Sequence, residues 1–163
     1  MPAPDSTVIL TALRDAMLAA GLVRRGSAPG NLPPILVEPS GGAPAPHDRA
    51  DAGDAAATRE TDNDLVVTLR YAGDVTPAPG PSARTRVVIA DLIYRSQGTT
   101  ALKAGRALDA AVAELLAGPT TYGQGVQLPG LFVVQASVWA GLSPVSDVDG
   151  IRTERAAYAL EAG

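Results

Sequence analysis

The sequence predicts an α+β domain in which two helices pack on one face of a mainly antiparallel or mixed sheet of four to five strands, with long loop insertions. Thr85–Ser96 and Ile151–Glu161 alternate with the two-residue period of a strand, and Leu131–Ala140 is a nearly continuous apolar run. Thr100–Leu116 instead repeats its apolar residues with the period of a helix. This succession of strand, helix, strand and strand belongs on one sheet, and no catalytic motif lies within it.

One domain is expected to span residues 1–163, because a chain of this length, if compact, buries roughly 70% of its unfolded surface. The aromatic residues are one Trp, one Phe and four Tyr, so the core must consist mainly of Ala, Val, Leu and Ile. A fold with so little aromatic area often relies on a neighbouring protein.

The first helix is predicted near the N-terminus. Asp5 or Ser6 is a suitable N-cap, and Gly21 supplies the left-handed conformation that ends a helix. The apolar positions with helical spacing are Ile9, Leu13, Ala16, Met17 and Ala20. After Pro33 and Pro34, the short apolar piece Ile35–Glu38 is predicted to form a weak edge strand.

A loop insertion is expected at about residues 39–63. This stretch is rich in Pro, Gly, Ala and Asp and has few large apolar residues, so it cannot offset its own chain entropy. A loop of this length inside a compact domain is uncommon, and it indicates either disorder or ordering against a partner.

The next strand is predicted at Leu65–Tyr71, followed by a proline-rich arm at about residues 73–84. The arm is too long for a two-residue hairpin and is expected to protrude. Thr85–Ser96 carries apolar residues on both faces, which predicts a central strand of the sheet.

The second helix is expected to begin after Thr99 or Thr100 and to end at Gly118–Pro119. Its predicted buried stripe is Leu102, Gly105, Leu108, Val112 and Leu115. A glycine-rich connection then leads to the buried strand Leu131–Ala140. Gly141–Gly150 is predicted as the turn before the last strand, Ile151–Glu161.

Composition excludes several classes of function. The formal net charge is -4 and no run of five like charges occurs, so the electrostatic footprint of a nucleic-acid-binding protein is missing. The lack of cysteine removes disulfides, thiolate catalysis and cysteine metal sites. The N-terminus has no basic region, and Thr11, Arg14 and Asp15 interrupt its apolar residues, so a soluble protein with no membrane span is expected.

The few motifs that carry chemistry each have a simpler interpretation. His47 is the only histidine and lies in the predicted insertion, where a solvated side chain is the simpler expectation. Ser146–Gly150, with the sequence SDVDG, has two of the acidic positions of a calcium loop, but Asp-Gly is more simply a hairpin turn.

Nothing in the sequence brings possible acid and base groups into one pocket. The carboxylates that could supply them are Asp91, Glu114 and Glu154. Asp91, on the predicted central strand, is expected to pair with an arginine or to lie at an interface. We therefore expect no enzyme activity, no catalytic residue, no cofactor and no metal site.

The order of the elements resembles the tail terminator (tail completion) proteins of long-tailed bacteriophages. The resemblance lies in a strand ending at Arg95, a helix with regular Ala/Leu spacing at Ala101–Leu116, and a strand ending near Pro144. An acidic-glycine turn at Asp147–Gly150 and a returning strand at Arg152–Leu160 follow. The short N-terminal helix Thr7–Ala20 also fits this pattern.

The resemblance implies a structural virion protein that forms a homo-hexameric ring on the tail tube, ends tail polymerisation and joins the tail to the head. Its implied partners are other copies of itself, the tail tube protein and the head-tail connector or stopper protein. DNA would pass through the ring without specific binding, since an acidic channel repels phosphates. Assembly would take place in the host cytoplasm, and the final location would be the tail or neck of the virion.

Interface roles are predicted for the two loops, because a closed ring needs contact surfaces on different sides of one subunit. The residues are Pro77, Pro79 and Arg84 in the arm, and His47, Asp48 and Arg49 in the insertion. The alternatives are another head-tail neck component, such as a head-completion, stopper or minor capsid protein, a small-molecule enzyme, and a small non-viral binding or chaperone-like module.

Overall fold

A computed structural model describes residues 5–25, 31–38, 64–75, 86–117, 126–128 and 131–162 of the 163-residue chain. The helices and strands occur in the order α1 (Ser6–Ala19), β1 (Arg24–Arg25), β2 (Pro34–Glu38), β3 (Leu65–Val75), β4 (Arg86–Gln97), α3 (Thr99–Ala117), β5 (Val126–Leu128), β6 (Leu131–Val148) and β7 (Ile151–Ala162). The predicted α+β class is confirmed.

The strands form one mixed sheet with the order β1-β2-β3-β4-β7-β6-β5. β1, β2 and β3 are mutually parallel, whereas β3, β4, β7, β6 and β5 pair antiparallel along the rest of the sheet. β4 is the fourth of the seven strands, so the prediction that it is central is confirmed. Its apolar residues on both faces suit a strand that is paired on each side.

Helix α1 forms where local signals predict it. The Asp5 carboxylate accepts a hydrogen bond from the Thr7 backbone N–H at 2.8 Å, which satisfies one of the free donors at the helix start. Gly21 follows the last turn with a φ of 71°, a conformation that costs glycine little. Both ends of the helix are therefore set by residues next to it in the sequence.

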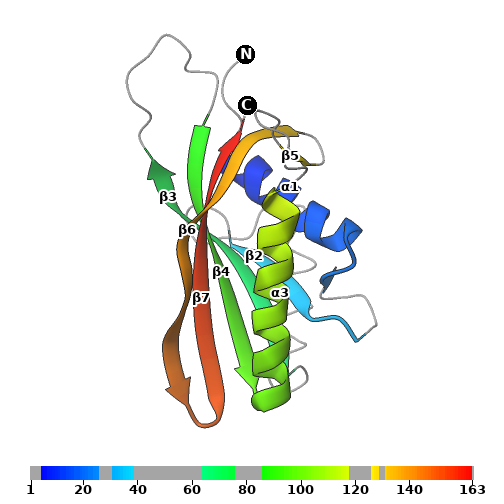
Figure 1. Ribbon diagram of the computed structural model, residues 1–163, viewed down its shortest axis with the longest axis vertical. Coiled ribbons are helices and arrows are strands. Elements are labelled where there is room, and N and C mark those ends of the chain that lie inside the picture. Colours follow the sequence, from blue (N-terminus) through cyan, green and yellow to red (C-terminus); the bar gives the residue numbers. More distant parts are fainter. Residues whose placement is uncertain are drawn as a thin grey trace.

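Both helices lie on the same face of the sheet (Figure 1). Strand residues that alternate toward this face, such as Val67, Leu69 and Leu92, form one buried cluster with Leu13 of α1 and Val112 of α3. The sheet curls around α1, because β2 near one edge and β5 at the other edge both contact this helix. We call the opposite side, which no described helix covers, the open face.

Helix α3 packs closely on the sheet at Gly105. A Cβ atom at this position would lie 3.3 Å from Leu65 Cδ1 and 3.6 Å from Tyr94 Cβ. The buried residues of the helix are Ala101, Gly105, Leu108, Val112 and Leu116. The predicted stripe was thus right at its centre and wrong at its ends, where Leu102 and Leu115 are only half-buried.

Two tyrosine hydroxyls bind α3 to the sheet at Asp109, one helix turn after Gly105. Tyr94 of β4 donates a hydrogen bond to Asp109 Oδ1 at 2.9 Å, and Tyr158 of β7 donates to the same oxygen at 2.6 Å. Burial, together with the Asp109 carboxylate, raises the pKa of both phenols well above the ordinary value of 10.0, because ionisation would place two negative charges side by side. The helix is therefore fixed by a polar contact inside an apolar interface.

The structure corrects several boundaries. Four to five strands were expected, and the described residues form seven, because the unpredicted short strands β1 and β5 extend the two edges of the sheet. Ile35–Glu38 belongs to β2, which lies between β1 and β3 and not at the edge of the sheet as predicted. β3 continues through a bulge to Val75, so residues 73–75 belong to a strand and not to the arm.

The largest correction concerns the end of the chain. β6 extends to Val148, and the turn is only Asp149–Gly150, where Gly141–Gly150 had been expected. Gly141 and Pro144 read as strand breakers, but a proline is tolerated in a strand whose outer side is unpaired. The predicted insertion at 39–63 and the remainder of the arm, residues 76–84, lie outside the described residues.

We expect Gly105→Val to destabilise the protein by about 1–3 kcal/mol, because the added side chain must displace Leu65 and Tyr94. Urea unfolding measures the change. Ala104→Val, on the exposed side of the same helix turn, is the control for valine where no neighbour has to move, and it should cost at most about 0.7 kcal/mol. Equal stability of the two variants would contradict the close approach at Gly105.

Alkaline pH should weaken the fold through Tyr94 and Tyr158. A group whose pKa is raised on folding contributes stability that is complete below its unfolded-state pKa, here 10.0, and is lost as pH rises toward its folded-state pKa. Tyr158→Phe should cost about 1.5 kcal/mol at neutral pH and flatten the decline in unfolding free energy above pH 10. An unchanged alkaline slope, measured by urea unfolding over a pH series, would contradict this assignment.

Candidate interface on the open face and the outer strand

The outer strand β6 presents large apolar side chains to solvent. β5 covers its first residues, pairing with Leu131–Val133, and beyond them no described strand pairs with its outer side. The exposed side chains are Val138, Trp139, Val145 and Val148, which are 54–61% accessible. We call Ala136–Val148, with these four side chains, the β6 border. Figure 1 shows this part of β6 running beside β7 to the turn that joins them, and β6 lies on the side of β7 opposite β4.

A long apolar edge strand is unusual for a protein that stays alone, because such edges pair with other chains unless charges, prolines or bulges blunt them. β6 contains no Lys or Arg, and Asp147 is its one charged residue. It does contain Pro144 and four register shifts against β7. These irregularities interrupt the ladder of backbone groups, so the border offers mainly side chains to a partner.

A hollow of about 290 Å³ lies on the open face, beside the β6 border. It is lined by Ile89, Asp91, Trp139, Ala140, Ser143, Arg155 and Ala157, which come from β4, β6 and β7. One wall is thus apolar and continuous with the exposed indole of Trp139, and another carries charge. We call this feature the open-face hollow.

The ion pairs in the open-face hollow and at Arg70 beside it contain more positive than negative groups. Asp91 Oδ2 lies 3.5 Å from Arg70 Nη2 and 4.0 Å from Arg155 Nη1, so one carboxylate forms ion pairs with two guanidinium groups. The Asp91 side chain is 9% exposed, whereas those of Arg70 and Arg155 are 43% and 46% exposed. Both separations exceed those of charge-assisted hydrogen bonds. The group as a whole is positive, with half of each arginine available to a partner.

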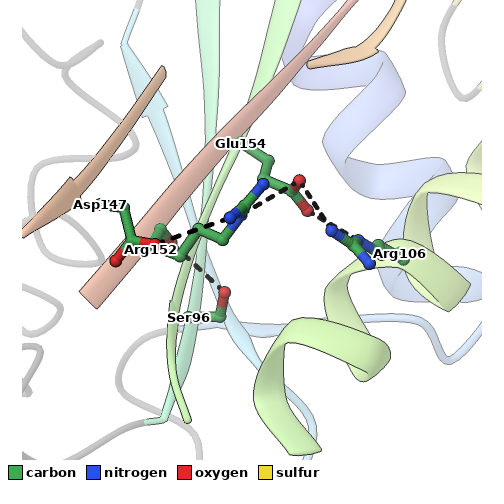
Figure 2. Close-up of polar contacts among 5 residues, drawn as sticks. All are labelled: Ser96, Arg106, Asp147, Arg152 and Glu154. Atoms are coloured by element: carbon green, nitrogen blue, oxygen red, sulfur yellow. Dashed lines mark hydrogen bonds and ion pairs between the residues drawn. The ribbon is translucent and has the colours of Figure 1, made fainter. Parts of the chain in front are cut away.

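A second ionic network lies on the helix-bearing face and holds the turn end of β6 and β7 (Figure 2). Arg106 of α3 donates two hydrogen bonds to Glu154 of β7, at 3.1 and 3.2 Å. Arg152 pairs with Glu154 at 3.4 Å and with Asp147 at 3.6 Å, and its carbonyl accepts a hydrogen bond from Ser96 Oγ at 3.3 Å. Helix α3, β4 and both strands of the hairpin are thereby joined.

The paired arginines lower the pKa of Glu154. The hydrogen bonds from Arg106 are the main cause, and burial opposes them. A similar pair closes the end of β3 and β4 that leads into the arm, where Arg86 donates to both oxygens of Asp74 at 2.9 and 2.8 Å. These hydrogen bonds likewise lower the pKa of Asp74.

The structure separates the carboxylates that the sequence had suggested as acid and base groups. Asp91 faces the open side of the sheet, Glu154 lies on the helix-bearing face, and Glu114 is exposed on α3. Asp91 does pair with arginine, as expected. Within the described part of the chain, no three His, Cys, Asp or Glu residues gather as a metal site would require.

The Ser146–Gly150 motif forms a turn. Asp149 and Gly150 have φ angles of 55° and 78°, and Val148 pairs with Ile151 across them, which is the geometry of a two-residue hairpin with positive φ at both positions. The hairpin interpretation of this motif is confirmed.

The six residues predicted at interfaces cannot be placed. Pro77, Pro79, Arg84, His47, Asp48 and Arg49 all lie outside the described residues. Sequence reasoning missed the β6 border and the open-face hollow instead. The exposed valines beyond Gly141 were an available signal for the border, but nothing in the sequence brings Arg70, Asp91 and Arg155 together.

Comparison of the sequence with known protein families and with curated proteins finds no match. Neither of the described helices is apolar over a length that could cross a membrane. The resemblance to tail terminator proteins therefore rests on the pattern of the elements in this chain.

Acid should weaken the junction of α3 and β7. A carboxyl whose pKa is lowered on folding contributes stability that is present above its unfolded-state value, here 4.5, and is lost as pH falls toward the folded-state pKa. We expect the wild-type protein to be more stable than Glu154→Gln at pH 7, with the difference shrinking below about pH 4.5. Urea unfolding at several pH values checks this.

Glu114→Gln is the matched control, because Glu114 is exposed on the same helix as Arg106. A pH-independent difference between wild type and Glu154→Gln would show that the pair with Arg106 does not control this part of the acid sensitivity.

Proposed function

We propose that this chain is a structural subunit of a bacteriophage virion. Six copies would form a ring at the head-proximal end of the tail tube, as the resemblance to tail terminator proteins implies. The ring would end tail polymerisation and join the tail to the head connector. Copies of the chain itself, the tail tube protein and a connector or stopper protein are its proposed partners. DNA would pass through the ring without specific binding.

The observation that carries this proposal is the β6 border. A strand of this length with four exposed large apolar side chains and no lysine or arginine is suited to burial against another protein. The open face adds a second uncovered surface on the same subunit. Two different contact surfaces on one chain are what a heterologous ring contact requires.

The charge of the chain is also consistent with a passage for DNA. Its formal net charge is -4, which would repel phosphates from a channel lined by several copies. Several acidic and basic groups of the described residues form ion pairs between helices and strands, and these residues gather no convergent set of acid, base and nucleophile in a pocket. These features favour an assembly role over an enzymatic one.

Native mass measurement of the full-length protein tests ring formation. Six copies of the 16.5 kDa chain would have a mass of about 99 kDa, and electron microscopy should show a closed ring. Trp139→Ala should weaken the assembly by about 30-fold or more, since a buried interface tryptophan commonly contributes about 2 kcal/mol or more. Val8→Ala is the control, because Val8 is also exposed and apolar but lies on α1, and this change should leave assembly unchanged.

A genetic experiment tests the position of the ring. A phage deprived of this chain should produce tails of uncontrolled length and heads without tails, both visible by electron microscopy of lysates. A protein that remains monomeric at high concentration, or a phage that makes normal joined tails without it, would overturn the proposed function.

A further inference from the structure

The turn between β6 and β7 combines apolar and acidic groups. Val145 and Val148 are 54% and 61% exposed, and Asp149 lies exposed at the corner. Asp147 is also exposed, but it pairs with Arg152. Asp149 makes no ion pair with any described residue, so the turn end carries one uncompensated negative charge. We call Val145–Gly150 the β6–β7 tip.

The open-face hollow has the complementary character. Arg155 in the hollow and Arg70 beside it share the carboxylate of Asp91, so these ion pairs set two positive charges against one negative charge. Trp139 and Ile89 supply apolar surface beside these groups. An exposed valine next to a carboxylate therefore matches the hollow in both polarity and charge.

We propose that the β6–β7 tip of one copy docks into the open-face hollow of the next copy. This contact would close the ring, so the proposal rests on the proposed function. The Asp149 carboxylate accepts hydrogen bonds from Arg155 and Arg70, and Val148 packs against Trp139. The occupant is a second copy of this chain because the chain itself presents both complementary surfaces. The contact buries Val145, Val148 and Trp139, three of the four exposed apolar side chains of the β6 border.

The contact must lie between copies. Ser143 lines the hollow and Asp149 lies six residues further along the same region, roughly 20 Å away in an extended strand. Pairing with β7 holds this strand extended, so a tip cannot fold back into its own hollow. Tip and hollow are different surfaces, and a contact between them is heterologous, the kind that generates rings.

Side-chain docking also suits the backbone of β6 better than strand addition does. Pro144 has no N–H to donate, and the register shifts at Val138/Ala140, Ala140/Ser143 and Pro144/Ser146 interrupt regular pairing. A continuous intermolecular ladder along this edge would meet an interruption every few residues. The tip, by contrast, is closed by a tight two-residue turn and keeps a fixed shape.

Cysteine cross-linking gives a direct test, since the natural sequence has no cysteine. A variant with Ser143→Cys in the hollow and Val148→Cys in the tip should form, under mild oxidation, a ladder of covalent oligomers ending at the ring. The control pairs Ser143→Cys with Val8→Cys, which is similarly exposed but lies on α1, and should give no ladder.

Charge variants test the chemistry of the contact. Asp149→Asn keeps a residue that favours the turn, and Arg155→Ala leaves Asp91 paired with Arg70. Each should weaken assembly by about fivefold, as expected for loss of a partly exposed charge pair. The double variant should be no weaker than the more affected single variant, because both changes remove the same interaction. Circular dichroism and thermal unfolding verify that each variant folds.

The outcomes separate the two proposals. A ring by native mass, a ladder from the tip and hollow pair and non-additive charge variants support the docking contact. A ring that forms without the ladder, with assembly unchanged in Asp149→Asn and Arg155→Ala, overturns the docking contact and leaves the proposed function standing. A wild-type protein that stays monomeric overturns both.

Discussion

The close contact of α3 with the sheet at Gly105 is the constraint on which the remainder of the structure depends. Leu65 and Tyr94 lie where a side chain at this position would lie, so the helix can settle directly on β3 and β4. One turn further along, Asp109 accepts hydrogen bonds from tyrosines of β4 and β7. The neighbouring Arg106 pairs with Glu154. A single helix thus fixes the three strands at the centre of the sheet.

Because both helices occupy one face, the other face is left to small, apolar and charged side chains. Asp91 is buried there only because two arginines offset part of its charge, an arrangement that holds β3, β4 and β7 in register while leaving the guanidinium groups partly exposed. Where the sheet curls, β2 and β5 contact α1. The end of β6 near Val148 does not belong to the buried core, and its valines are exposed. A one-sided sheet with an exposed apolar border is well suited to an assembly in which neighbouring subunits provide the missing cover.

Features that depend on nearby residues were predictable from the sequence. The Asp5 cap, Gly21 and the spacing of Ile9 and Leu13 define α1, and the Asp149–Gly150 pair defines the last hairpin. The limits of β6, and the existence of β1 and β5, were not predictable in this way. A strand of two or three residues is too short to show a periodicity. A proline such as Pro144 would end a strand inside a sheet, but it is tolerated in a strand at the edge.

The sequence by itself determined the α+β class, the two amphipathic helices, the central strand and the tight final turn, because each follows from capping, periodicity or local backbone preference. Only the tertiary structure decided which strand lies at the border and which charges meet. Arg70, Asp91 and Arg155 are far apart in the chain and become neighbours through the pairing of β3, β4 and β7. The candidate interface depends on that strand order, which is set by burial of the whole sheet against the helices and by no short segment of the sequence.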